Sequence, residues 1–127
     1  MKKQVDIIFE NENFSVFDKP AGWLTIPARF KEDKRPCLSA KGLFTVHRLD
    51  EEVSGLVIFA KSAAAHRIAN LWFEEHTIQK FYEAYTEGEM EKSKKNPTRY
   101  NWHMKLLRGK KRAYESECGK DCETIAT

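Results

Sequence analysis

The sequence has few cysteines, glycines and prolines and no long apolar segment. Its 127 residues include three cysteines, too few and odd in number for the disulfide framework of a small secreted domain. Six glycines and four prolines argue against a collagen-like or low-complexity chain. No apolar run approaches the roughly 20 residues of a membrane-spanning helix, and the run that follows Met1 is too short for a secretory signal. We therefore expect a cytoplasmic protein without membrane association.

Two of the cysteines, Cys118 and Cys122, resemble half of a zinc site, with His103 as a distant third ligand. A structural zinc ion needs four ligands, and the sequence offers no second pair at ligand spacing. We expect no metal ion.

Positive charge is concentrated near the C-terminus. The net charge is +3, but nine basic residues and no acidic residue lie between Lys92 and Arg112. Tyr100, Trp102 and His103 are interleaved with them, and such stretches can bind phosphates while bases stack on the rings. The stretch is typical of a surface for a polyanion, although a solvated charged hairpin has the same composition. The candidate backbone contacts are Lys105, Arg108, Lys110, Lys111 and Arg112.

The first half of the chain predicts strands. Residues 5–9 and 14–18 surround a turn-rich segment and predict a β-hairpin. Residues 43–49 predict another strand, and the apolar run 56–60 predicts a strand covered on both faces. A long charged loop, residues 27–42, lies between them and the hairpin.

The second half predicts one helix and more strands. Ser62 is a good N-cap for a helix that ends near residues 76–77. Its apolar stripe is Ala64, Ile68, Leu71 and Trp72. Alternation predicts a strand at 78–85, and shorter strand pieces follow around 102–107, 113–117 and 123–127. The fold class is α+β or mixed α/β, with one clear helix.

A candidate site lies where residues 45–50 end. If this segment is extended, Arg48 and Asp50 share a face. A cation beside a carboxyl group lowers its pKa, which suits a nucleophile or general base. A structural ion pair is the alternative interpretation of these two residues.

Several motifs together resemble the RluA family of pseudouridine synthases. Residues 47–56 read His-Arg-Leu-Asp-x-x-Val-Ser-Gly-Leu and are followed by Phe-Ala-Lys at 59–61. Lys-Pro-Ala-Gly at 19–22 is similar to the family's loop after the first hairpin, and Lys-Phe-Tyr-Glu-Ala at 80–84 to its Lys-x-Tyr-x-Ala strand. The Ala-His-Arg at 65–67 and the Gly-Lys segment at 119–124 also match in order. The resemblance covers nearly the whole chain.

The resemblance implies a mainly antiparallel sheet with few helices, with residues 1–127 as the N-terminal part of a catalytic domain. The family usually has threonine where Val53 stands. Its members continue into strands with a Gly-Arg-Thr-His type segment, whose basic residue pairs with the catalytic aspartate. We therefore expect a truncated chain, and no separate N-terminal RNA-binding domain.

The resemblance also implies roles for individual residues. Asp50 is the catalytic carboxylate, and Tyr82 stacks on the uracil and assists removal of its C5 proton. Arg48 fills the space of the flipped nucleotide and Lys80 binds substrate, while His47 is a scaffold residue. Strand packing of Tyr82 and an ion pair of Arg48 with Asp50 are the structural alternatives.

As a function, the resemblance implies isomerisation of specific uridines in ribosomal or transfer RNA by a monomer that needs no cofactor. The chemistry involves no redox change, so neither a metal nor an organic cofactor is required. The alternative is a non-catalytic RNA-binding module or an inactive truncated remnant of the same fold.

Overall fold

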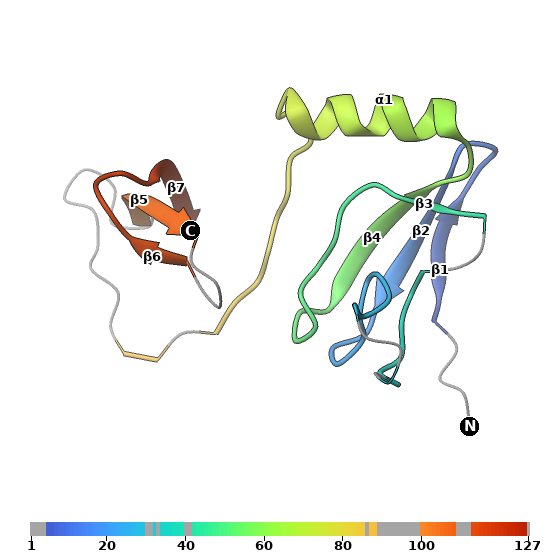
Figure 1. Ribbon diagram of the computed structural model, residues 1–127, viewed down its shortest axis with the longest axis horizontal. Coiled ribbons are helices and arrows are strands. Elements are labelled where there is room, and N and C mark those ends of the chain that lie inside the picture. Colours follow the sequence, from blue (N-terminus) through green and yellow to red (C-terminus); the bar gives the residue numbers. More distant parts are fainter. Residues whose placement is uncertain are drawn as a thin grey trace. The chain divides into compact units, whose positions relative to one another are not determined.

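The computed structural model describes residues 5–29, 32, 34–39, 42–85, 87–88, 100–108 and 113–126. They belong to two compact units, Met1–Phe81 and Tyr82–Thr127, and each is described by itself. Both units contain antiparallel sheets, and the first also contains a helix (Figure 1). The α+β class with a mainly antiparallel sheet is confirmed.

The first unit is built on a four-stranded antiparallel sheet in the order β1-β2-β4-β3. Its strands are β1 (Ile7–Glu10), β2 (Phe14–Lys19), β3 (Phe44–Thr45) and β4 (Gly55–Ala60). The predicted hairpin is β1 and β2. The Asn11 side chain closes its turn, because Oδ1 accepts the amides of Asn13 at 2.9 Å and Phe14 at 2.7 Å.

The largest buried cluster lies on the face of this sheet that carries Val57 and Phe59. Leu38, Leu49, Val57 and Phe59 form its buried cluster. In β4 the alternation of side chains buries Val57 and Phe59, whereas Leu56 is 57% exposed. The prediction that residues 56–60 are covered on both faces is therefore wrong at Leu56.

The predicted strand at 43–49 is much shorter than expected. Only Phe44 and Thr45 pair with β4. Farther along, both backbone polar groups of Leu49 bond to the Thr25 hydroxyl instead of a neighbouring strand. At Leu49 the chain is therefore held by a side chain and not by a sheet ladder.

The helix α1 (Ala63–Glu74) begins as predicted, with the Ser62 hydroxyl accepting the Ala65 amide at 3.1 Å. It crosses the first unit near the end of β4 (Figure 1). Its buried residues are Ala65 and Ala69, whereas Ile68 is 51% exposed. The predicted apolar stripe is thus wrong at Ile68, whereas Trp72 of the stripe packs on Phe14 of β2 with ring centroids 5.2 Å apart. Small alanine side chains permit close packing.

The second unit has three antiparallel strands in the order β6-β5-β7. They are β5 (Tyr100–Arg108), β6 (Ala113–Glu115) and β7 (Lys120–Ala126), near the three predicted pieces. Gly119 is required before β7, since a Cβ atom there would lie 2.6–2.8 Å from backbone atoms of Leu106.

Residues 78–85 do not form the predicted strand. None of them belongs to either described sheet. Phe81 is 88% exposed and Tyr82 is 63% exposed. The alternating pattern identifies side-chain faces, but a strand also needs a neighbour for its backbone groups.

Candidate functional site

The candidate site is the turn formed by residues 50–53. It is closed by a hydrogen bond of 3.2 Å from the Val53 amide to the Asp50 carbonyl. Asp50 is exposed and directly follows the buried Leu49. Arg48 is also exposed, and the ion pairs found among the described residues do not join it to Asp50. The carboxylate is therefore presented to solvent from an anchored backbone.

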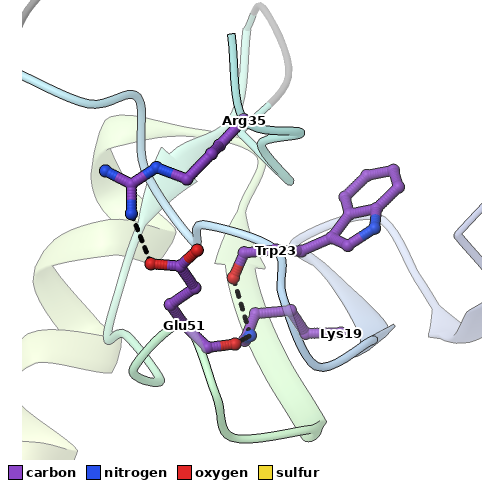
Figure 2. Close-up of polar contacts among 4 residues, drawn as sticks. All are labelled: Lys19, Trp23, Arg35 and Glu51. Carbon is purple, nitrogen blue, oxygen red and sulfur yellow. Dashed lines mark hydrogen bonds and ion pairs between the residues drawn. The ribbon is translucent and has the colours of Figure 1, made fainter. Parts of the chain in front are cut away.

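Lys19 anchors this turn from the interior. Its side chain is fully buried at the end of β2. The ammonium nitrogen donates to the carbonyl oxygens of Pro20 at 3.1 Å, Trp23 at 2.8 Å and Glu51 at 3.2 Å. Figure 2 shows the last two bonds converging on Nζ. One buried cation thus joins the loop after β2 to the residue that follows Asp50.

Burial and neighbouring carboxylates shift the pKa of Lys19 in opposite directions. Burial lowers the pKa of Lys19 because it disfavours the charged ammonium group. The charges of Glu51, Asp50 and Glu52 raise it, but by less. Lys19 is therefore a buried lysine near three carboxylates, and the spacing argument, which concerns only Arg48, does not identify it.

The same backbone is held from a second side by the segment that follows Lys19. The buried Thr25 hydroxyl donates to the Leu49 carbonyl at 2.9 Å and accepts from the Leu49 amide at 3.1 Å. The Gly22 amide donates to the Glu51 carbonyl at 2.8 Å. Gly22 has a φ of +82°, which glycine adopts without strain. Residues 19–25 therefore form a cradle for residues 49–51.

Glu51 has a further partner in the long loop. Its carboxylate accepts a hydrogen bond from the Arg35 guanidinium (Figure 2). The turn is thus contacted by two cations, Lys19 at the backbone and Arg35 at a side chain.

His47 links the strand segment to β4 and the helix. Its Nε2 accepts the Ile58 amide at 3.1 Å, and its ring stacks on Phe73 with centroids 5.0 Å apart. Burial lowers the pKa of His47, and the charge of Lys80 lowers it further. A neutral ring that accepts at Nε2 carries its proton on Nδ1. This arrangement fits the scaffold role expected for His47.

The remaining predicted residues belong to both units. Lys80 is exposed, with Nζ 5.9 Å from the centre of the Phe73 ring. Tyr82 belongs to the second unit, and so does Lys105, which is exposed on β5. Arg108 ends β5. Three predicted residues lie outside the described part of the chain: Lys110, Lys111 and Arg112.

Sequence reasoning missed the residues that hold the turn. In the sequence Lys19 is part of the Lys-Pro-Ala-Gly motif, and its charge gives no sign that it is buried. Thr25 is an ordinary loop residue in the sequence, and nothing near it signals a bond to Leu49. Arg35 lies 16 residues from Glu51, in a loop rich in charge of both signs.

No group of three or more histidine, cysteine or acidic side chains in the described ranges is placed to hold a metal ion. His103 and Cys122, named above as zinc candidates, lie in β5 and β7, and the structure describes only the backbone of these two residues. Over the same ranges, no helix has the length and apolar character needed to cross a membrane.

Comparison with known proteins identifies the family. The RNA pseudouridylate synthase family model matches residues 13–126. The chain is 33% identical over 91 residues to tRNA pseudouridine synthase C of Yersinia pestis, covering 66% of this chain and 35% of that protein. It is 32% identical over 102 residues to the dual-specificity RNA pseudouridine synthase RluA of Haemophilus influenzae, covering 72% of this chain and 44% of that protein.

The fold comparison agrees. The human RNA pseudouridylate synthase domain containing 4 superposes with a TM-score of 0.56 at 12% identity, over 92% of this chain and 51% of that one. The chain thus spans about half of that structure and less than half of each curated relative named above. The family match over residues 13–126, together with these relatives, shows that the chain belongs to the RNA pseudouridylate synthase family and is of the RluA type.

Proposed function

We propose that this protein isomerises specific uridines of ribosomal or transfer RNA to pseudouridine, with Asp50 as the catalytic carboxylate. The observation that carries the proposal is the position of Asp50. It lies in the family's His-Arg-Leu-Asp signature and is exposed on a turn whose backbone is fixed by Lys19 and Thr25. A carboxylate that must meet an RNA nucleotide needs both access and a fixed orientation.

The reaction exchanges one bond for another. The bond from the ribose C1′ to the uracil N1 breaks, the base turns, and a bond from C1′ to C5 forms. C5 then loses its proton and N1 gains one, so the product is an isomer of the substrate. In our proposal Asp50 acts on the nucleotide during the first exchange, and Tyr82 stacks on the base and assists removal of the C5 proton.

Access to the base requires that the nucleotide leave its helix or loop. Extruding a base costs a few kcal/mol, which a side chain that occupies the vacated space offsets. We assign this role to Arg48, which is exposed two residues before Asp50. Lys80 supplies a second cation for the substrate. The basic stretch that contains Lys105 and Arg108 is proposed to follow the RNA backbone.

The names of the relatives support the proposed substrate class. Their names include a tRNA enzyme and a dual-specificity enzyme, and the His-Arg-Leu-Asp form belongs to the branch that modifies ribosomal or transfer RNA. We propose that the chain acts as a monomer in the cytoplasm, without a cofactor.

The direct test measures tritium release from ribosomal and transfer RNA labelled at uridine C5. We expect tritium release by the unaltered chain and full release by Glu52→Ala. In Asp50→Ala the rate of release should fall at least 1000-fold, on the order of the loss when an essential catalytic group is removed. Glu52 is the matched control because it is an exposed carboxylate in the same turn. Equal release by the unaltered chain and Asp50→Ala would contradict the role of Asp50.

The same experiment decides the alternative. The alternative is a non-catalytic RNA-binding module or an inactive remnant of the same fold, and the chain spans 35% of the Yersinia relative and 44% of the Haemophilus relative. RNA binding with no tritium release by the unaltered chain would establish the module and refute catalysis by these residues.

A further inference from the structure

The end of the long loop is tied back to the segment that cradles the turn. We call residues 34–38 the strap. The Leu24 amide donates to the Pro36 carbonyl at 2.9 Å, and the Leu38 amide donates to the Leu24 carbonyl at 2.8 Å, which makes an isolated parallel bridge between Leu24 and Cys37. Leu38 is buried in the same cluster as Leu49. The strap is therefore fixed beside the chain that leads into Asp50.

Glu51 connects the strap to the turn. Its carboxylate binds Arg35 of the strap, and its carbonyl receives the Lys19 ammonium at 3.2 Å and the Gly22 amide at 2.8 Å. Because Glu51 directly follows Asp50, restraints on its side chain and on its carbonyl hold the Cα of Glu51 and limit movement of the backbone next to Asp50.

We propose that Arg35 is a positioning residue: through Glu51 it holds the turn 50–53, and so fixes the direction in which Asp50 points. The consequence for catalysis rests on the function proposed above, whereas the consequence for the turn does not. The Arg35 and Glu51 side chains are 47% and 31% exposed, so dissolved salt screens their attraction. Salt therefore loosens the turn even when no RNA is present.

The test measures hydrogen exchange of the Gly22 and Val53 amides by NMR, on the full chain and without RNA. These amides bond to the Glu51 and Asp50 carbonyls and report the turn directly. We expect Arg35→Gln and Glu51→Gln each to speed exchange about two- to fivefold, the range for a partly exposed ion pair. The double variant should exchange no faster than either single variant. Lys34→Gln is the control, since it removes a neighbouring exposed charge of the strap.

The salt dependence of hydrogen exchange provides a second test of the proposal. Raising the ionic strength should speed exchange in the unaltered chain and in Lys34→Gln, and should have little effect in Arg35→Gln. Unchanged exchange in Arg35→Gln, or additive effects in the double variant, would overturn the proposal.

A kinetic readout separates positioning from RNA binding. In the tritium assay, Arg35→Gln should lower kcat about two- to fivefold, the same factor as for exchange, and leave KM unchanged. The reason is that a misdirected Asp50 impairs the chemical step. A raised KM with unchanged kcat and unchanged exchange would show instead that Arg35 contacts RNA. If the unaltered chain releases no tritium, the proposed function fails, while the exchange data still decide whether Arg35 holds the turn.

Discussion

Replacing the buried lysine tests the central feature of the site. Lys19→Met keeps a long unbranched side chain in the same space but removes the ammonium group. Three carbonyl oxygens, those of Pro20, Trp23 and Glu51, then lose a charged donor. We expect the first unit to unfold more easily, and the turn 50–53 to open more often than the rest of the unit.

The magnitude follows from two opposing effects. A hydrogen bond from a charged group contributes about 1.5–3 kcal/mol, so three of them are worth several kcal/mol. Burial of an ammonium group costs several kcal/mol, which the substitution relieves. The net loss should be about 2 kcal/mol, which lowers the Tm of a unit of this size by roughly 8–16 °C.

The assay is chemical and thermal unfolding of the two variants Lys19→Met and Lys34→Met. Lys34 is exposed, so its substitution should change the free energy of unfolding by less than about 0.5 kcal/mol. Equal stabilities of the two variants would refute the reasoning, since they would show that the three bonds only offset the cost of burial.

The pH dependence gives an independent check on Lys19. Its pKa is lowered in the folded protein, so between that value and the ordinary value of about 10.4 the unfolded chain binds more protons. Stability therefore rises with pH in this window for the unaltered chain but not for Lys19→Met. An advantage of the unaltered chain that shrinks as the solution becomes alkaline would contradict the lowered pKa.

Two further predictions concern His47 and the basic stretch. Because the pKa of His47 is lowered in the fold, the free energy of unfolding should fall as the pH drops below about 6.5. His47→Gln should lose this dependence, since its amide oxygen can still accept the Ile58 amide, whereas the exposed control His76→Gln should retain it. Equal pH profiles of the unaltered chain and His47→Gln would contradict the lowered pKa of His47. Neutralising Lys110, Lys111 and Arg112 together should reduce the slope of log affinity for RNA against log salt by about two to three, and a slope matching that of the unaltered chain would show that these residues do not touch the backbone.

The sequence predicted the elements whose cause is local. The Asn11 turn and the Ser62 cap use side chains within three residues of the groups that they bond, so the pattern alone is sufficient. The strand at 78–85 failed because pairing depends on a distant neighbour. The helix stripe was wrong at Ile68 because the face that packs near β4 carries Ala65 and Ala69.

The candidate site also combines a local feature, which the sequence predicts, with supports from distant residues, which it does not. The signature around Asp50 is contiguous and could be identified from the sequence. Its supports could not, because the Lys19 and Glu51 bond spans 32 residues and the Thr25 and Leu49 bond spans 24. A single sequence records which residues carry charge or a hydroxyl group, but it does not record which of them the fold buries together.

The burial of Lys19 also separates two kinds of lysine in this protein. Acylating reagents attack amines that solvent reaches, and the Lys19 amine is closed to solvent. Treatment of the folded chain with acetic anhydride would thus cancel exposed lysine charges, including that of Lys105, and spare the ammonium group that secures the cradle. Chemical modification can therefore remove exposed positive charge without disturbing the internal framework.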